Sequence, residues 1–308
     1  MSLTLIEAAK LETGSEISRA IIEMYAGSSD ILQNLPFTSI QGNALKYCRE
    51  TNMPGVGFRG VNESYTSSTG VLNPLTEMLS ISGGELDVDT FIIETMGMDQ
   101  RSVQEQMKVR SLALAWTNKF INGDSSVDPR EFDGLKKRIT GGQLVAAGNT
   151  ANGTALSLSK LDEAIDQTLE PTHLLMNKAI RRRLTQAARD TSVGGFITYE
   201  TSNFGRTITK YNDMPILIVD LDNEGNEILP FTEKATSGTD TATSIYILSL
   251  GDGALTGIQN GGIRVQDLGV LQSEPKYRTR VEWFNGICIM NGRSVTRLHS
   301  IANAPITK

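Results

Sequence analysis

The stretch from Asp99 to Gly123 constrains this chain more than any other. Its sequence, DQRSVQEQMKVRSLALAWTNKFING, holds no proline, and its one glycine is the last residue. Asp99 can cap the first turn, and Gly123 stands where a left-handed C-terminal stop is expected. The pattern predicts one helix over residues 99–122, about 36 Å long at 1.5 Å per residue.

The apolar residues of this helix form two lines rather than one stripe. If each residue turns by about 100°, the two lines lie roughly 140° apart. The first line is Val109, Leu112, Ala113, Trp116 and Phe120, and the second is Val103, Met107, Leu114 and Ile121. Two interpretations stay open. The helix is either buried inside one core, or it is a spine with its own domain on one side and an arm or a neighbouring subunit on the other.

Composition narrows the class of protein. The 308 residues are 39% apolar and 21% charged, as in a soluble globular chain, and the formal net charge is −6. This charge argues against tight, general binding to nucleic acid, which needs a basic surface. No apolar run reaches the length of a membrane span, and the N-terminus does not have the pattern of a signal peptide. Cys48 and Cys288 form no CxxC motif, so we expect folding in a reducing cytosol without disulfides or zinc.

Few residues of the chain are suited to catalysis. The two histidines, His173 and His299, are both expected to pack as structural residues. No Ser-His-Asp or Cys-His set can be assembled from the sequence with useful support. We therefore predict no catalytic residue, no cofactor and no metal site.

Three short motifs resemble reactive sites but fit simpler structures. Residues 251–253 (GDG) follow a predicted strand with no helix behind them, which favours a turn over a phosphate-binding loop. Residues 157–160 (SLSK) spell the SxxK motif of serine acylation, yet Ser159 is better explained as a helix cap. Asp87 and Asp89 form a DxD pair without the further acidic residues that a metal site needs.

The N-terminal part contains two predicted arms. Residues 3–26 are expected to form an amphipathic helix that docks on another surface. Residues 39–50 and 75–82 are strand-like, although neither alternating face of 39–50 is clearly apolar, and the intervening stretch is rich in Gly, Pro, Asn, Ser and Thr. Its aromatic and basic residues, such as Phe58 and Arg59, are not typical of a disordered linker. We predict a two-stranded arm with an ordered tip that lies on another subunit, because an isolated hairpin is marginal in water.

The remainder of the chain alternates helices with strands and then becomes strand-rich. Predicted helices cover residues 159–169 and 177–190, and predicted strands cover 172–177, 196–199, 206–210, 214–220 and 244–250. Residues 181–183, three arginines, either form a solvated helix face or meet phosphates. Asn285-Gly286 and Asn291-Gly292 predict two hairpin turns of a three-stranded antiparallel meander that packs on the long helix.

The order of these segments resembles the major capsid protein of tailed bacteriophages, of the Hong Kong 97 type. Together the segments that carry the likeness cover most of the chain. They are residues 54–70 (PGVGFRGVNESYTSSTG), 83–92 (GGELDVDTFI), the long helix with 131–139 (EFDGLKKRI), 171–177 (PTHLLMN), 211–220 (YNDMPILIVD) and 281–298 (VEWFNGICIMNGRSVTRL).

The resemblance implies an α+β fold with five parts. These are an N-terminal arm (1–35), an extended β-hairpin loop (36–85), a peripheral domain with the spine helix (86–135, helix 99–122), an axial α/β domain (136–261), and the returning strands and C-terminus of the peripheral domain (262–308).

The resemblance also implies a structural, non-enzymatic role. The protein would assemble in the bacterial host cytoplasm into hexamers and pentamers of an icosahedral shell, the virion capsid. The implied partners are further copies of the chain, a separate scaffolding protein, a portal, an optional decoration protein and weakly contacted double-stranded DNA, but no membrane. The residues expected at intersubunit contacts are Phe58, Arg59, Glu63, Tyr65, Arg181, Arg182, Arg278 and Arg280.

Two alternatives stay open. An encapsulin-like compartment would share the fold and enclose a cargo enzyme instead of DNA. An α/β enzyme would bind a nucleotide at the glycine loop of residues 251–257, and would be a monomer or small oligomer with saturable ligand binding.

Overall fold

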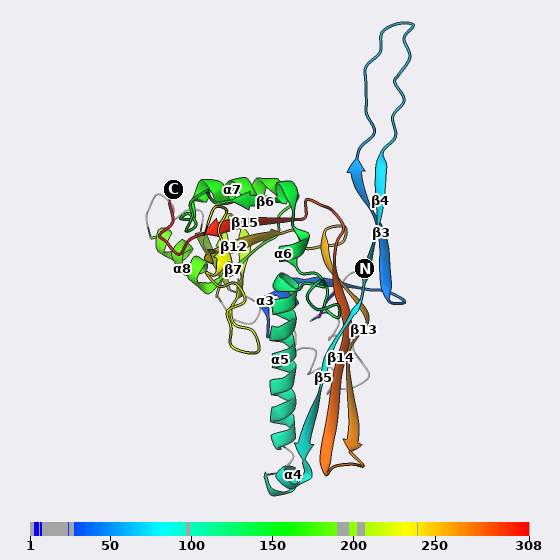
Figure 1. Cartoon of the computed structure of the whole chain (residues 1–308), viewed down its shortest axis with the longest axis vertical. Helices are drawn as coiled ribbons and strands as arrows, with labels where there is room; N and C mark the ends of the chain where they lie inside the picture. The colour runs from blue at the N-terminus through cyan, green and yellow to red at the C-terminus, as the bar shows by residue number, and fades with distance from the viewer. Residues whose placement is uncertain are drawn as a thin grey trace.

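The chain folds into a body that contains two β-sheets and a long helix. A β-hairpin, which forms a two-stranded sheet of its own, projects from this body (Figure 1). The computed structural model describes residues 3–5, 7, 24, 28–96, 99–189, 197–201, 207–238 and 240–307. Most of the helix expected over residues 3–26 therefore lies outside the described residues. Its first two described positions, Leu3 and Thr4, instead form the short strand β1.

The first sheet has five strands in the order β1-β2-β13-β14-β5. β14 pairs antiparallel with β13 on one side and with β5 on the other, and β2 joins the far edge of β13 in parallel. The strand bounds are β1 Leu3–Thr4, β2 Pro36–Ser39, β5 Ser80–Asp89, β13 Leu255–Val270 and β14 Lys276–Ile289. Helix α3 (Asp30–Asn34) precedes β2, and α4 (Thr90–Met96) leads from β5 into α5 (Asp99–Asn122).

The second sheet has eight strands, in the order β6-β15-β12-β7-β10-β9-β8, with β11 paired to β12. Helices α7 and α8 pack on one face of this sheet, and the opposite face packs on the end of α5. The bounds are β6 Leu144–Ala146, α7 Leu158–Gln167, β7 His173–Asn177, α8 Lys178–Ala187, β8 Ile197–Thr201, β9 Thr207–Tyr211, β10 Met214–Val219, β11 Glu233–Lys234, β12 Asp240–Leu248 and β15 Val295–Ile301. The short helix α6 (Leu135–Arg138) and the 3-10 turn η1 (Gly141–Gln143) connect α5 to this sheet.

The long helix predicted over residues 99–122 is confirmed as α5. Four residues of its first apolar line are buried and the fifth, Leu112, is half-buried. Trp116 lies at the centre of an aromatic cluster. The ring centroids of Phe120 and Trp283 lie 5.3 Å and 5.8 Å from that of Trp116, and Phe37 and Phe132 lie slightly further out. These rings come from α5, from β2 and β14 of the first sheet, and from the loop before α6. One face of α5 thus joins the parts of the body into one core.

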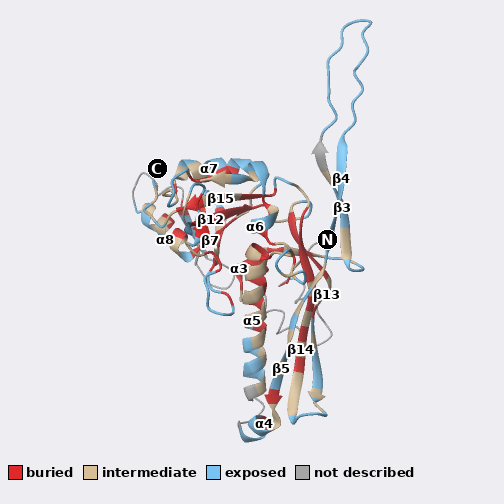
Figure 2. Ribbon diagram, in the orientation of Figure 1, coloured by how far each residue is buried: buried red, intermediate tan, exposed pale blue. Residues whose placement is uncertain are grey.

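The second apolar line of α5 is covered only towards the C-terminal end of the helix. Ile121 is buried and Leu114 half-buried, but Val103 and Met107 are 47% and 61% exposed. Figure 2 shows the same gradient, from exposed to buried, along α5. Within one chain, the helix is therefore held on one side along most of its length and on two sides only near its end.

The glycine that follows α5 does not act as the predicted left-handed stop. The φ of Gly123 lies outside the left-handed region, and a Cβ there would stand 2.4 Å from the carbonyl oxygen of Phe132 and 2.5 Å from that of Lys119. The backbone N–H of Gly134 donates to the carbonyl of Gly123 at 2.8 Å. Glycine is needed because two backbone segments approach closely, not because of a turn.

The predicted turn at Asn285-Gly286 is wrong, and so is the three-stranded meander. β14 continues straight through these residues, where Asn285 pairs with Gln259 of β13 and Ser80 of β5. The Asn285 side chain is buried and accepts a hydrogen bond from Nε1 of Trp116 at 2.9 Å. Asn291-Gly292 does make a turn, but β15 then enters the second sheet beside β12 and β6. The Asn-Gly signal failed at residue 285 because tertiary hydrogen bonds hold this asparagine in a strand.

The expected cap at Ser159 is also wrong. Helix α7 begins at Leu158, so Ser157 occupies the N-cap position and Ser159 lies inside the first turn. The segment of residues 75–82 is likewise split, because β4 (Val71–Met78) belongs to the projecting hairpin and β5 starts at Ser80 in the first sheet. The strands predicted at 172–177 and 214–220 are confirmed as β7 and β10.

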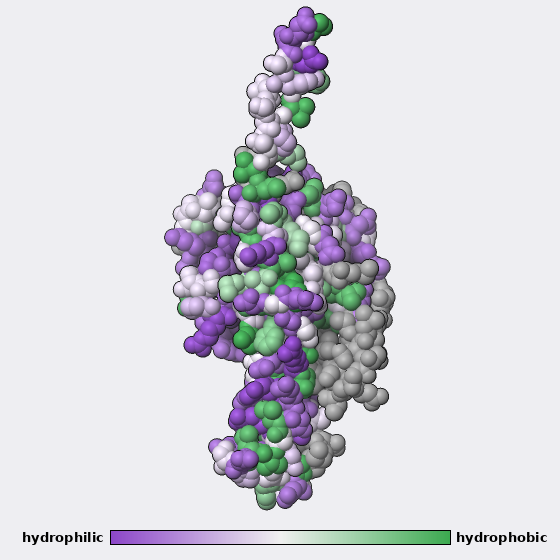
Figure 3. All heavy atoms as spheres, turned by 90° about the vertical axis from the view of Figure 1, so that its right-hand side faces the viewer, coloured by the Kyte–Doolittle hydropathy of each residue, from purple (hydrophilic) through white to green (hydrophobic). Residues whose placement is uncertain are grey.

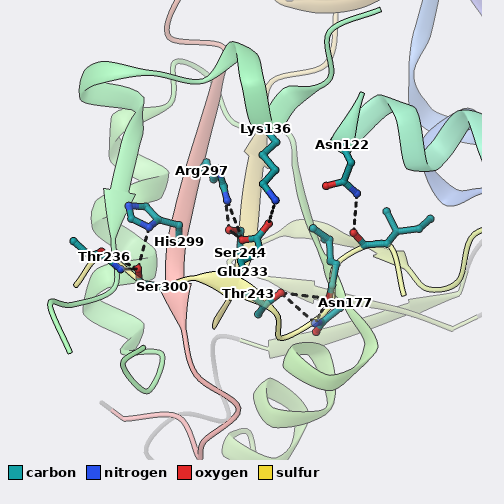
Figure 4. Close-up of polar contacts among 12 residues, drawn as sticks. Asn122, Lys136, Asn177, Glu233, Thr236, Thr243, Ser244, Arg297, His299 and Ser300 are labelled. Atoms are coloured by element: carbon teal, nitrogen blue, oxygen red, sulfur yellow. Dashed lines mark hydrogen bonds and ion pairs between the residues drawn. The ribbon is translucent and has the colours of Figure 1, made fainter. Parts of the chain in front are cut away.

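A buried ionic cluster joins α6 to the second sheet (Figure 4). The carboxylate of Glu233 on β11 is 6% exposed and pairs with Arg297 of β15 at 2.9 Å and with Nζ of Lys136 at 3.3 Å. The hydroxyl of Ser244 donates to the same carboxylate. Burial by itself would raise the pKa of Glu233, but Arg297, Ser244 and Lys136 outweigh it and hold this pKa below its ordinary value.

Replacing Phe120 by Ala should cost about 3–5 kcal/mol of unfolding free energy, because the ring is fully buried in the aromatic cluster. Met107→Ala on the exposed side of the same helix should cost less than about 1 kcal/mol. Urea unfolding of the unassembled chain measures both. Equal losses at the two positions would contradict the one-sided core.

Replacing Glu233 by Gln should cost about 3 kcal/mol near pH 7, because it leaves the buried Arg297 guanidinium without its counter-charge. A carboxyl whose pKa is lowered in the folded state stabilises the fold above its ordinary pKa, so the wild-type advantage should shrink as the pH falls below about 4.5. Thermal unfolding between pH 3 and 7 measures the difference. Glu163→Gln, in an exposed ion pair with Lys160, is the control and should show little change at any pH. A wild-type advantage that persists undiminished at pH 3 would contradict the role of this charge.

Candidate interaction site

The projecting hairpin is the most exposed part of the described chain. β3 (Ala44–Asn52) pairs antiparallel with β4, and the two strands form a sheet of their own. Beyond them, every residue from 53 to 70 is exposed, and the tip extends far from the body (Figure 1). A two-stranded ribbon with both outer edges unpaired is marginally stable and offers backbone groups to another chain.

The tip of this hairpin presents apolar side chains to solvent. Phe58 is 106% exposed, and Val56 and Val61 are 94% and 91% exposed. Apolar residues are visible at the end of the hairpin and again at its root (Figure 3). The exposed apolar residues of β4 are Val71 and Leu72, next to the tip, and Met78, at the end nearer the body, and Ile81 follows in β5. Apolar groups gathered in this way mark a surface that another molecule covers.

The tip is internally ordered. The guanidinium of Arg59 lies over the ring of Tyr65, 5.3 Å from its centroid, and donates to the backbone carbonyl of Glu63 at 3.2 Å. The carboxylate of Glu63 in turn accepts from the N–H of Gly60 at 2.8 Å, and Asn62 between them has a φ of 67°. The four predicted contact residues of the tip therefore lie together. Arg59, Glu63 and Tyr65 shape a turn, while Phe58 projects from it.

The root of the hairpin is fixed to the body by polar contacts. Both Nη atoms of Arg138 on α6 bind the carboxylate of Glu77 on β4, at 2.6 and 2.8 Å. Tyr47 and Arg49 on β3 donate to the backbone carbonyl of Ile289 at the end of β14. Burial, followed by the fields of Cys288 and Glu77, raises the pKa of Tyr47 to about 12. Burial by itself would lower the pKa of Arg138, but the hydrogen bonds with Glu77 and the charges of nearby groups, Glu77 first, outweigh it and raise this pKa.

The sequence did not predict this contact at the root of the hairpin, although residues 39–50 showed an unusual pattern with no clearly apolar face. Leu45, Tyr47 and Arg49 share one face of β3, a mixture that is untypical of a half-buried strand. The structure explains it, because this face meets backbone carbonyls and an ion pair rather than an apolar core. Further exposed apolar side chains are Phe91 and Ile92 of α4 and Val103 and Met107 of α5. The last two belong to the second apolar line of the long helix, which one interpretation of the sequence assigned to an arm or a neighbouring subunit.

The four other predicted contact residues lie elsewhere. Arg278 on β14 binds Asp87 of β5 through two nitrogens at 2.6 and 2.7 Å, and Arg280 pairs with Glu85. These charges are matched within the chain. Arg182 on α8 is exposed, whereas the neighbouring Arg181 is half-buried, with an Nε that has no hydrogen-bond partner among the described residues.

The residues considered for chemistry in the sequence are buried, ion-paired or part of a turn. Burial lowers the pKa of His173 to about 4, and Lys160 of the SxxK motif pairs with Glu163. The GDG residues form a turn, and strand β13 starts at Leu255, where a phosphate loop would need a helix. In the described part of the chain, no group of three or more His, Cys, Asp or Glu side chains is placed to hold a metal ion. None of its helices is long and apolar enough to cross a membrane.

No known family model matches the sequence, and no curated protein matches it either. Solved structures do match its fold. The holo-SrpI encapsulin complex from Synechococcus elongatus PCC 7942 is 17% identical, with a TM-score of 0.64, over 100% of this chain and 99% of that chain.

Capsids give similar values. The capsid of a native GTA particle is 14% identical, with a TM-score of 0.62, over 89% of this chain and 91% of that one. A chain of Mycobacterium phage Adephagia is 11% identical, with a TM-score of 0.61, over 88% and 89% of the two chains. These likenesses confirm the fold that the order of the sequence segments predicted. The chain has the α+β fold of Hong Kong 97-type capsids.

Proposed function

We propose that this protein is the major capsid protein of a tailed bacteriophage, which assembles with copies of itself into an icosahedral shell around double-stranded DNA. The observation that carries the proposal is the projecting hairpin, whose ordered apolar tip is uncovered in the single chain. The fold supports it, since similar structures include the capsid of a GTA particle. Many modest contacts of this kind, repeated by symmetry, give a stable closed assembly.

In this proposal each part of the chain has a separate task. Residues 1–35 are the N-terminal arm, 36–85 the extended loop laid on the adjacent subunit, 86–135 and 262–308 the peripheral domain, and 136–261 the axial domain. Because β15 pairs with β12 and β6, residues 295–301 are better grouped with the axial domain. Phe58, Arg59, Glu63 and Tyr65 are the proposed tip contacts. The arginines at 181, 182, 278 and 280 stay predictions.

The proposed partners follow from a shell around packaged DNA. They are hexamers and pentamers of this chain, a scaffolding protein, a portal and an optional decoration protein. The net charge of −6 suits a lining that lets DNA move during packaging without binding it tightly. The role is structural rather than enzymatic, with assembly in the bacterial cytoplasm and residence in the virion.

A second candidate is an encapsulin-like compartment that encloses a protein cargo. Its support is the match to the SrpI encapsulin, which extends over 100% of this chain, against 89% for the GTA capsid. Light scattering and negative-stain microscopy of the purified protein, alone and with a co-expressed scaffold candidate, test the shell proposal. Capsomers, tubes or hollow shells support it, and enclosed protein would favour the second candidate. A monomer or dimer that never assembles would contradict both.

Replacing Phe58 by Ser or Arg59 by Glu should raise the protein concentration needed for assembly by about tenfold or more, because an interface anchor is worth about 2 kcal/mol or more. Neither change should alter the unfolding temperature of the unassembled chain, since the tip is exposed. Sedimentation across a concentration series measures assembly.

Val127→Ser is the matched control for Phe58→Ser. Val127 is also apolar and 83% exposed, but it lies in the loop after α5. Assembly of both tip variants at the wild-type concentration would contradict the proposed contact.

A further inference from the structure

Helix α6 carries three consecutive basic residues, and each pairs with a different part of the chain. Lys136 reaches Glu233 of the second sheet at 3.3 Å. Lys137 binds Asp124 and Asp133, at 2.6 and 2.8 Å, in the loop between α5 and α6. Arg138 binds Glu77 of the projecting hairpin through both of its terminal nitrogens.

The start of α6 is anchored to the end of α5. Leu135 is fully buried in the core that contains the aromatic cluster. The N–H of Gly134, just before the helix, donates to the carbonyl of Gly123, just after α5. The short helix is therefore held in place on the body while its first and last basic residues reach outwards.

The contact with the hairpin is firm. The side chains of Arg138 and Glu77 are 16% and 18% exposed, and the paired geometry fixes their relative orientation. The Nε of Arg138 also donates to the backbone carbonyl of Asp133 at 2.6 Å. One guanidinium therefore joins Glu77 of the hairpin to the backbone just before α6.

The contact with the second sheet is a single ion pair between the half-exposed Lys136 and the buried Glu233. Glu233 also binds Arg297 of β15 and Ser244 of β12, so Lys136 joins a network that ties three strands together. Figure 4 shows Lys136 approaching Glu233 from α6, on the side away from β15. A change in the register or tilt of these strands displaces the carboxylate that Lys136 binds.

We propose that α6 couples the projecting hairpin to the second sheet, so that loosening the contact at one end of this helix loosens the contact at the other. The coupling arises from ion pairs within one chain and stands independently of the shell proposed above. It sets the angle of the hairpin relative to the second sheet through one short helix. Such coupling is reciprocal, so a perturbation at either end must be felt at the other.

Amide hydrogen exchange of the full-length protein, kept in one assembly state for all variants, tests the coupling. Lys136→Gln should accelerate exchange of the β3 and β4 amides near Tyr47 and Glu77 by about fivefold or more, although these residues do not touch Lys136. Lys136→Arg should restore the wild-type rate. Lys160→Gln, which breaks an exposed ion pair on α7, is the matched control and should leave the hairpin unchanged.

The reverse experiment guards against a variant that fails to fold. Glu77→Gln changes a partly exposed residue of the hairpin and should accelerate exchange at β11 and at the start of β12. If Lys136→Gln changes only the second sheet and Glu77→Gln only the hairpin, each within twofold of wild type at the distant site, α6 is a passive anchor and the proposal is wrong.

Discussion

The burial of one aromatic face of α5 is the contact on which both sheets depend. Trp116 packs against Trp283 of the first sheet, and Phe120 belongs to the core that also holds Leu217 and Tyr246 of the second. The indole N–H of Trp116 is satisfied by Asn285, which removes the cost of burying it. Because α5 contributes to a core shared by one face of each sheet, neither sheet could pack in this way without it.

The core around α5 stabilises the body, and this explains how the projecting hairpin can remain exposed. The body is stabilised locally, so the hairpin can extend into solvent with its apolar tip exposed. Only its root is fixed, by an ion pair and by hydrogen bonds to carbonyl groups. A stable body with an exposed apolar arm is the form that the proposed shell requires of its subunit, which would complete its packing with other copies of itself.

Much of the fold could be predicted because its signals are local. The helix of residues 99–122 has an uninterrupted helical pattern, and the strands of residues 172–177 and 214–220 are short apolar runs, so all three were predicted correctly. The turn predicted at Asn285-Gly286 was wrong. The hydrogen bond from Trp116 and the pairing with two neighbouring strands outweigh a turn preference that is worth little by itself. Gly123 misled for a related reason, since the backbone that approaches it comes from a later loop.

Of the candidate site, the sequence indicated the tip of the hairpin but not the contacts at its root. The tip could be found because aromatic and basic residues stand out in a stretch rich in glycine and serine. The contact at the root could not be predicted, because Glu77 and Arg138 are 61 residues apart in the sequence. They form an ion pair only because the fold places β4 beside α6. The same holds for Lys136 on α6 and Glu233 on β11, which are distant in the sequence and meet only in the fold.

The central claim is that the hairpin tip is completed by another copy of the chain. A cryo-electron microscopy reconstruction of assembled particles, at a resolution that traces residues 53–70, tests it most directly. We expect the tip to lie on a neighbouring subunit, with Phe58 buried between the two chains. A tip that is folded back on its own body, or that stands free in solvent within a complete shell, would contradict the account.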